Sequence, residues 1–415
     1  MTNEFRENLS APNRKKGLAS WVIFASTLLV VLISLTTVVF PALVIRSFGG
    51  ITEYSGIDPF ETGIWAHTLL VADVVIFGMI ILYFKNKLPQ LLANSIRFVF
   101  NFEVSARIAF LAVFIILGFY VAFTITEVST AEPWPDYYNR VKPILANWTI
   151  DSGDGIDQYV TLFLLSTSLN VFGNGKAIPF IASIAMLLVT YLLTTEIAKK
   201  RFAGILSMII VLQSGTFLIF DTTATYPNFW VLFYLLSLYL CYKKWPLSPI
   251  SFILSVLSKQ NTALFLPMTL FFTHDSGLPK QKKIYVVIIY GTIAALSVVA
   301  ILIGMKISFW GFTGDVSSFQ LHDFWKAFNA FSYQLRFDGL ILILLLPLTI
   351  GLGIASRKKI VHADSILFLI LGAILSQPFM AAITIISSEP YRFMPLITFC
   401  AIGVGVIFSK KVKPI

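Results

Sequence analysis

The sequence predicts an all-α membrane protein that crosses the bilayer about twelve times, and its composition is the first reason. Of the 415 residues, 57% are hydrophobic and 13% are charged, with a mean hydropathy of +0.82. An ordinary soluble domain has about 45–50% apolar and about 25% charged residues. The composition therefore excludes a soluble enzyme, a disordered chain and a fibrous repeat. Cys241 and Cys400 both lie within apolar runs, so they predict neither a disulfide framework nor a thiolate metal site.

Apolar runs along the chain are the second reason. A membrane-spanning helix needs about 20 mostly apolar residues. The first run exceeds the apolar region of a signal peptide, about 7–15 residues, and lacks a small-residue cleavage site. Two of the runs are short. The predicted spans are residues 21–45, 64–84, 108–126, 177–197, 202–220, 228–242, 248–258, 262–273, 284–305, 339–355, 364–386 and 393–409.

The distribution of charge predicts the orientation of these spans. Lysine and arginine gather in alternate loops, with clusters at 199–201, 280–283 and 357–359, whereas most acidic residues lie in the other loops. Because positive residues mark cytoplasmic loops, we expect both termini in the cytoplasm. The net charge of +10 is then an orientation signal and predicts no nucleic-acid partner. A crossing at Tyr159–Phe172 would turn every later basic cluster outward, so that short run predicts an interfacial helix.

Two long loops on the predicted outer side hold side chains suited to chemistry. Residues 127–158 combine acidic and aromatic side chains, and residues 306–338 are rich in aromatic ones. Aromatic side chains also anchor helices at lipid headgroups, which explains part of this pattern. The acidic candidates of the first loop are Glu132, Asp136 and Asp157.

Lys259 and Arg392 are cations at helix boundaries on the predicted outer side, against the general trend. A lysine in such a place can simply extend its ammonium group to the headgroups. Alternatively, the two cations bind a lipid phosphate, because a desolvated phosphate needs paired charges and arginine can donate to two oxygens. With the acidic loop nearby, they predict a site with cations for a phosphate and a carboxylate that removes a proton.

Several short motifs, taken in order, resemble those of the membrane glycosyltransferases with the GT-C fold. The similar families are the dolichyl-phosphate-mannose protein mannosyltransferases and the aminoarabinose lipid A transferases. The resembling motifs are Pro135-Asp136-Tyr137, Phe172-Gly173, Ser258-Lys259-Gln260-Asn261 and Arg392-Phe393-Met394-Pro395. The resemblance covers about residues 108–409. It implies a GT-C-like domain over residues 108–415, preceded by a two-helix addition over residues 1–107.

The resemblance implies an activity and a site. Such an enzyme moves a mannose-like hexose or a related sugar from a polyprenyl or dolichyl monophosphate to an acceptor protein, lipid or glycan. The transfer occurs on the extracytoplasmic side of the cell membrane or the endoplasmic reticulum membrane, with inversion at the sugar. By this resemblance Asp136 is the general base, and Lys259 and Arg392 bind the donor phosphate.

The chain departs from the family pattern at three places. Asp157-Gln158 stands where the family often has Glu-Lys, Tyr137 replaces a second acid, and Tyr226 replaces an acid before a proline, with Asp221 upstream. No cofactor is therefore firmly predicted, and a divalent metal ion is the alternative. The supporting acids are Asp157, Asp221 and Glu132. The candidate substrate contacts are Gln158, Tyr137, Trp134, Tyr226, Asn261, Tyr391 and His322.

A secondary transporter or a lipid flippase with twelve helices is the competing hypothesis. Transporters of the major-facilitator type have two similar halves, whereas the long loops and short runs here have no counterparts across the middle of the chain. Asp73 is nearly alone as a charged residue within a span, which makes it a functional candidate. Alternatively, it faces a neighbouring helix. His322 with Asp323 could ligate a metal, and a local hydrogen bond is the alternative reading.

Overall fold

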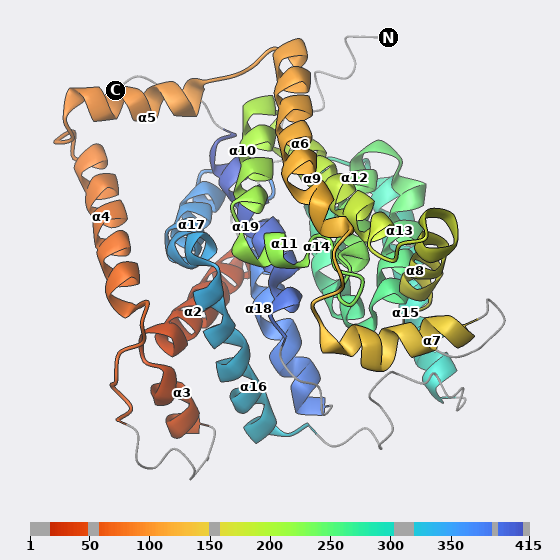
Figure 1. Cartoon of the computed structure of the whole chain (residues 1–415). Coiled ribbons are helices and arrows are strands. Elements are labelled where there is room, and N and C mark those ends of the chain that lie inside the picture. Colours follow the sequence, from red (N-terminus) through yellow and green to blue (C-terminus); the bar gives the residue numbers. More distant parts are fainter. Residues whose placement is uncertain (1–16, 49–57, 149–157, 303–318, 384–388, 410–415) are drawn as a thin grey trace.

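The computed structural model describes residues 17–48, 58–148, 158–302, 319–383 and 389–409 (Figure 1). Within these ranges all regular structure is helical and no β-strand is present. The all-α class that the composition predicts is therefore confirmed for the described part of the chain.

Seven helical segments in the described ranges are long and apolar enough to cross a membrane. Each reaches the length of about 17–25 residues that a bilayer requires. The length and apolarity of these helices indicate an integral membrane protein with several spans. The seven segments are α2 (Leu18–Val39), α4 (Ala66–Phe84), α6 (Ala106–Val128), α9 (Ala177–Ala198), α17 (Gly339–Arg357), α18 (Ala363–Ile383) and Pro390–Ile407, which comprises η7 (Pro390–Phe393) and α19 (Met394–Ile407).

The other helices are shorter, apart from α15, or connect the long ones. On the predicted outer loops lie η2 (Tyr137–Val141), α7 (Lys142–Asn147), α16 (Leu321–Tyr333) and η6 (Gln334–Phe337). The remaining predicted spans correspond to α10 (Arg201–Leu212), α11 (Gly215–Phe220), α12 (Phe229–Lys243), α13 (Ser248–Ser258), η5 (Gln260–Phe265), α14 (Leu266–Asp275) and α15 (Lys280–Leu302). The short η4 (Trp245–Leu247) lies between two of them, before α13.

Two predicted spans are divided, and each division has a local cause. The run 21–45 breaks at Phe40, and Pro41 then begins α3 (Pro41–Phe48), because a residue before proline avoids helical geometry. The run 202–220 breaks between α10 and α11. There Ser214 Oγ accepts a hydrogen bond from Phe217 N at 3.1 Å, which caps α11, and donates to the carboxylate of Asp338.

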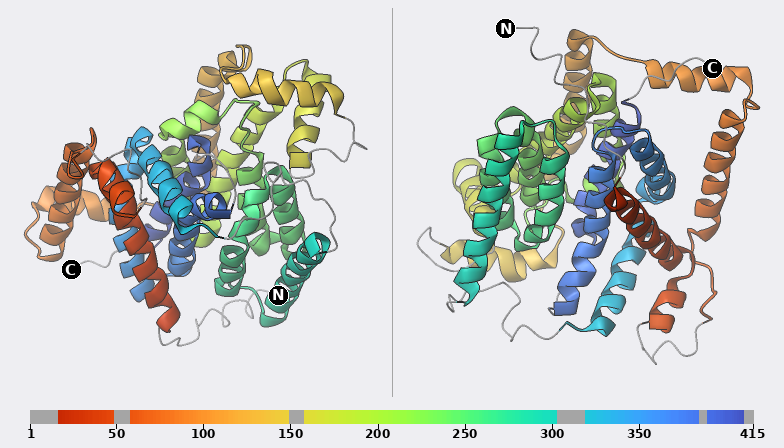
Figure 2. Two further views of the ribbon diagram at one scale, coloured as in Figure 1. Left: turned by 90° about the horizontal axis from the view of Figure 1, so that it is seen from below. Right: turned by 180° about the vertical axis from the view of Figure 1, so that it is seen from behind.

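The centre of the molecule is formed by α18 and α19, which α17, α2, α9 and α10 surround (Figure 2). Ile370, Phe399 and Cys400 are completely buried there. Hydroxyl groups in this apolar core donate to backbone carbonyls of neighbouring helices. Ser207 Oγ donates to Ala401 O at 2.7 Å, so a buried polar group is satisfied and α10 is joined to α19.

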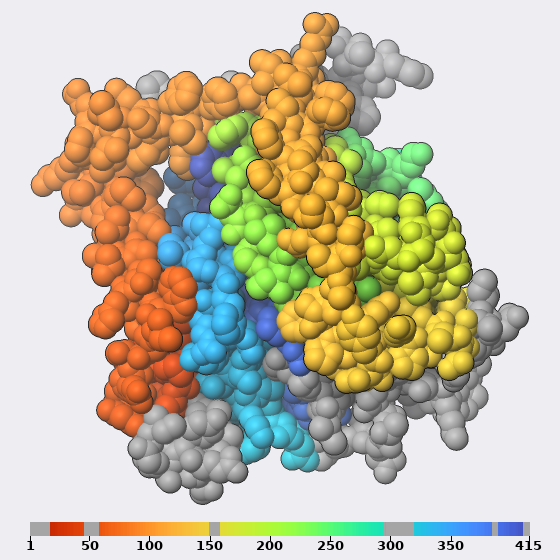
Figure 3. Space-filling view, viewed as in Figure 1, coloured from red at the N-terminus to blue at the C-terminus, as the bar shows by residue number. Residues whose placement is uncertain are grey.

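The helices α4 and α5 (Gln90–Asn101) lie at the periphery (Figures 1 and 3). The sequence places residues 85–107 in a loop, but α5 is a helix with no buried residue and with exposed Leu91 and Phe98. Most of α4 is exposed, and it packs on α17. Asp73 is one of its few buried residues, which agrees with the interpretation that this carboxylate faces protein. In contrast, α2 lies in the core, and the domain division at residue 107 stays a prediction.

Two basic segments of the chain come together at one end of the helix bundle. At this end Lys200 Nζ donates to Phe100 O at 2.6 Å, and Lys358 Nζ lies 5.8 Å from the ring centroid of Phe84. These contacts bring the basic segments at 199–201 and 357–359 to the ends of α4 and α5. From this end α6 runs to the opposite end of the bundle, across which α7 lies (Figure 1).

The helix α8 (Tyr159–Phe172) has the bounds that the sequence predicts. It ends at Gly173, whose φ of +64° lies in the left-handed region that glycine tolerates best. It packs against α9 and α13, and Thr161 Oγ1 donates to Ser258 O at 2.9 Å. The helix therefore supports the residue that directly precedes Lys259, while its interfacial position stays a prediction.

Gly204 provides a test of the packing between α9 and α10. A Cβ atom at this position would stand 2.2 Å from Thr195 Oγ1 and 2.6 Å from Tyr191 O. We expect Gly204→Ala to lower the free energy of unfolding by about 1–3 kcal/mol, as overpacking does. Thermal unfolding in detergent measures the change. Gly78→Ala on α4, where nothing lies near the new Cβ, is the control. Wild-type stability of the Gly204 variant would contradict this packing.

Candidate functional site

Asp136 lies half-buried at the end of the bundle opposite the basic segments, directly before η2. Its Oδ2 accepts a hydrogen bond of 2.6 Å from the hydroxyl of Tyr226. Tyr226 belongs to the non-helical segment between α11 and α12, so two distant parts of the chain meet at this carboxylate. Burial and the neighbouring Asp136 raise the pKa of Tyr226, and the phenol therefore remains the donor of this bond at neutral pH.

Tyr226 connects Asp136 to the first of the two predicted phosphate ligands. Its ring stacks on the ring of Tyr391 with centroids 4.3 Å apart and planes inclined by 15°. Lys259 Nζ donates to the hydroxyl oxygen of Tyr391 at 2.5 Å and lies 3.8 Å from that ring's centroid. The ring of Trp230 contacts the same ammonium group from α12, at 5.4 Å. One pair of stacked tyrosines thus links the carboxylate to the lysine.

Arg392 is the second cation of this cluster. Its Nε donates to the hydroxyl of Tyr391 at 3.4 Å, and its Nη1 donates to Gln377 Oε1 at 2.6 Å. Gln377 is a buried polar residue of α18. Among the described residues, no carboxylate lies within ion-pair distance of Lys259 or Arg392. The two cations therefore share the hydroxyl of Tyr391, and the carboxylate of Glu389 acts on Lys259 only from beyond ion-pair distance.

The electrostatics of Lys259 agree with a place for an anion. Burial, with a further contribution from the nearby positive charge of Arg392, lowers the pKa of Lys259 to about 8, while Tyr391 and Glu389 oppose the shift. A cation buried in this way is costly unless a negative group pairs with it. An anionic ligand would supply that partner and restore the pKa toward its ordinary value.

Aromatic side chains form the wall between the two halves of the site. Trp134 stacks on Phe220 at 5.2 Å between centroids and contacts Tyr226 at 5.6 Å edge to face. Phe220 in turn contacts Tyr391 at 5.8 Å. These ring contacts hold the tyrosine pair in place.

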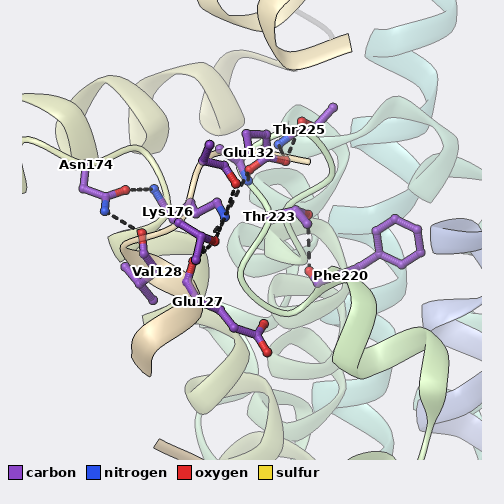
Figure 4. Close-up of polar contacts among 11 residues, drawn as sticks. Glu127, Val128, Glu132, Asn174, Lys176, Phe220, Thr223 and Thr225 are labelled. Atoms are coloured by element: carbon purple, nitrogen blue, oxygen red, sulfur yellow. Dashed lines mark hydrogen bonds and ion pairs between the residues drawn. The ribbon is translucent and has the colours of Figure 1, made fainter. Parts of the chain in front are cut away.

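A buried ion pair fixes the loop that carries Asp136 (Figure 4). Glu132 accepts hydrogen bonds from Ala224 N at 3.1 Å and from Thr225 Oγ1 at 2.7 Å. Lys176 Nζ lies 4.0 Å from Glu132 Oε2 and donates to backbone carbonyls, including that of Glu127 at 3.2 Å. The backbone around Tyr226 is therefore tied to the segment that leads to Asp136. Sequence analysis did not single out Lys176, although a lysine at the predicted outer start of a span was a signal for it.

Asp221 directly follows Phe220 of the aromatic wall and is buried. It is 1% exposed, and its Oδ2 accepts a hydrogen bond from the hydroxyl of Tyr120 at 2.8 Å. Burial raises the pKa of the Asp221 carboxyl to about 7, and the bond from Tyr120 opposes that rise. Sequence analysis predicted a supporting acid here, and the structure places it one residue after Phe220.

Among the described residues, the other predicted site residues make no hydrogen bond or ring contact with the stacked tyrosines. Tyr137 contacts Tyr138 edge to face at 5.3 Å, Gln158 is half-buried before α8, and Asn261 is buried beside Lys259 in η5. His322 is exposed at the start of α16, next to Asp323 at 3.5 Å, which fits the local hydrogen bond better than a metal site. No group of three His, Cys, Asp or Glu side chains that could hold a metal ion occurs among the described residues. Asp157 lies outside the described residues.

Comparison with known proteins returns no relative for this chain: no family model and no curated protein matches it, and no solved structure resembles it.

The carboxyl of Asp221 predicts a pH dependence of stability. The folded protein keeps the proton up to about pH 7, whereas the unfolded chain, with a pKa near 3.8, loses it much earlier. This contribution is fully present below the unfolded pKa and is lost as the pH rises through about 7. We expect Asp221→Asn, which has no proton to lose, to gain stability relative to the wild type as the pH rises from about 4 to about 7. Chemical unfolding at several pH values measures this, and parallel curves would contradict it.

Proposed function

We propose that this protein is a membrane glycosyltransferase of the GT-C type, which moves a sugar from a polyprenyl or dolichyl monophosphate to an acceptor. The observation that carries the proposal is the joining of Asp136, Lys259 and Arg392 by one pair of stacked tyrosines. These residues lie far apart in the sequence. A carboxylate beside two cations that share one hydroxyl is the arrangement that phosphate departure and proton removal require.

Each half of the site has a task in this reaction. The donor's phosphate is a leaving group, and negative charge grows on its oxygens as the bond to the sugar breaks. Lys259 and Arg392 stabilise that charge in surroundings from which water is largely excluded. Asp136 accepts the proton of the acceptor hydroxyl, which attacks from the opposite face and inverts the anomeric carbon. One carboxylate is enough for this step, unlike the pair that glycoside hydrolases use.

The orientation that accompanies the proposal has the site on the extracytoplasmic side and both termini in the cytoplasm, with twelve crossings. Its support is the gathering of the basic segments 199–201 and 357–359 at one end of the bundle, beside α5. Asp136 lies beyond the far end of α6 from these segments. Positive residues are retained on the cytoplasmic side of membranes, so the opposite end is the outer one.

The catalytic role of Asp136 is tested by Asp136→Asn. The amide keeps the shape of the side chain and its bond to Tyr226 but cannot accept a proton, so we expect sugar transfer to fall by about 10²–10⁴-fold. The measurement follows radioactive sugar from synthetic polyprenyl-phosphate mannose and related donors into acceptors of a total membrane fraction. Asp323→Asn, at an exposed carboxylate, is the matched control.

Two further outcomes of this assay decide between the proposal and its alternative. Full transfer by the Asp136 variant would remove this residue from the mechanism. If the wild type forms no glycosidic bond with any donor but moves prenyl-phosphate lipid between the leaflets of sealed vesicles, the protein is a flippase.

The orientation is tested by single cysteines at two exposed asparagines. Asn139 lies in η2 beside the site, and Asn94 lies in α5 at the basic end. The two native cysteines are buried, so they contribute little background. In intact cells we expect a membrane-impermeant maleimide to label Asn139→Cys and not Asn94→Cys, with both labelled after permeabilisation. The reverse pattern would overturn the orientation.

A further inference from the structure

The two stacked tyrosines occupy both positions that the proposed reaction needs free. The hydroxyl oxygen of Tyr391 accepts from Lys259 Nζ at 2.5 Å and from Arg392 Nε at 3.4 Å. The hydroxyl of Tyr226 donates to Asp136 Oδ2 at 2.6 Å. The hydroxyl of Tyr391 thus occupies the position that an anion oxygen would take between the two cations. The hydroxyl of Tyr226 is bonded to the carboxylate that would accept the proton.

An anion competes directly with the hydroxyl of Tyr391. A phosphate oxygen carries negative charge, so it attracts the ammonium and guanidinium groups more strongly than an uncharged phenolic oxygen does. A bound phosphate therefore replaces the phenolic oxygen as the partner of Lys259 and Arg392. The phenol of Tyr391 must then leave the position between the two cations.

The ring of Tyr391 cannot move without affecting Tyr226. The rings are stacked at 4.3 Å and are nearly parallel, and both contact the same ring of Phe220. Tyr226 has no other hydrogen-bond partner for its hydroxyl among the described residues besides Asp136. When the stack loses one member, Tyr226 keeps its edge contacts with Trp134 and Phe220 and its bond to Asp136, but the ring is free to shift on the side that Tyr391 leaves and the geometry of that bond is disturbed.

We propose that the Tyr226–Tyr391 pair couples the two halves of the site, so that a prenyl phosphate bound at Lys259 and Arg392 frees the carboxylate of Asp136. This inference rests on the proposed function for the role of Asp136 as a base. It gives the reaction an order in which the donor binds before the acceptor is deprotonated. Without a donor the base stays covered, and Tyr226 and Tyr391 act as positioning residues.

The exposure of Asp136 can be followed without any sugar transfer. Dicyclohexylcarbodiimide is a hydrophobic reagent that modifies protonated carboxyl groups, and mass spectrometry of peptides quantifies the product at each residue. The purified full chain in detergent is treated at one fixed pH with no ligand, with inorganic phosphate, with farnesyl phosphate or with farnesol. Asp323, an exposed carboxylate, reports the general reactivity of the reagent.

We expect farnesyl phosphate to raise the labelling of Asp136 about tenfold relative to Asp323, since a hydrogen bond to a charged group contributes an effect of that order. Inorganic phosphate should act in the same direction at higher concentration, and farnesol should not act at all. A rise with farnesol alone, or no rise with either phosphate, would overturn the coupling.

Two conservative variants separate coupling from simple shielding. Tyr226→Phe keeps the stacked ring but removes the hydroxyl, so Asp136 should be labelled strongly with or without phosphate. Tyr391→Phe leaves room for a phosphate oxygen between the cations while the ring stays stacked, so phosphate should bind without raising the labelling. Wild-type behaviour of either variant would count against the proposal, and both variants keep the ring packing on which folding depends.

The result is distinguishable from a failure of the proposed function. Phosphate-dependent labelling without any sugar transfer would preserve the coupling and remove the transferase. Sugar transfer with phosphate-independent labelling would preserve the transferase and remove the coupling.

Discussion

In a chain that lies largely in lipid, each backbone N–H and C=O group needs a partner within the protein, because the hydrocarbon core offers no water. The long helices meet this constraint by themselves. Elsewhere the chain meets it with side chains: Ser214 and Asp338 satisfy the ends of α11 and α17, where two helices begin. The positions at which helices can break are therefore limited to places where such side chains are available.

The candidate site lies at one of these places. The segment between α11 and α12 is not helical, and the carboxylate of Glu132 accepts from the backbone N–H groups of Ala224 and Thr225. Lys176 balances the charge of that buried carboxylate. The irregular backbone that presents Tyr226 is thus stabilised by the same acidic loop that presents Asp136. Glu132, which fixes the backbone around Tyr226, and Asp136, the proposed base, are only four residues apart. A change at Glu132 would therefore disturb both the backbone and the position of the base.

Much of the fold could be predicted from local sequence, because length, apolarity and the residue at each helix end are local properties. The run Tyr159–Phe172 ends at Gly173 as expected, and the bounds of α9 and α17 differ from the prediction by only a few residues. The break after α10 could not be predicted in the same way, since the partner of Ser214 is Asp338, far along the chain. The amphipathic α5 was missed because its apolar residues are too few to resemble a span.

In the candidate site, too, local sequence indicates some of the residues but not the contacts between them. Asp136, Lys259 and Arg392 stood out as charged residues in unusual places, but nothing local indicates that Tyr226 and Tyr391 stack between them. Gln377 was a weaker signal, an amide within an apolar run that becomes the partner of Arg392. Pairwise contacts between distant aromatic residues are set by how the helices pack, and one sequence holds little information about that.

The distance along the chain between Asp136 and Tyr391 also has a consequence for biosynthesis. The acidic loop is made early and Tyr391 is made near the end, so at about 5–20 residues per second the ribosome needs tens of seconds to supply the second after the first. During that interval Tyr226 can already bond to Asp136, but its ring lacks the partner on which it stacks and Lys259 lacks the hydroxyl of Tyr391. A nascent chain of this kind is most exposed to quality control before its last helices insert, and completion of the aromatic stack closes that window.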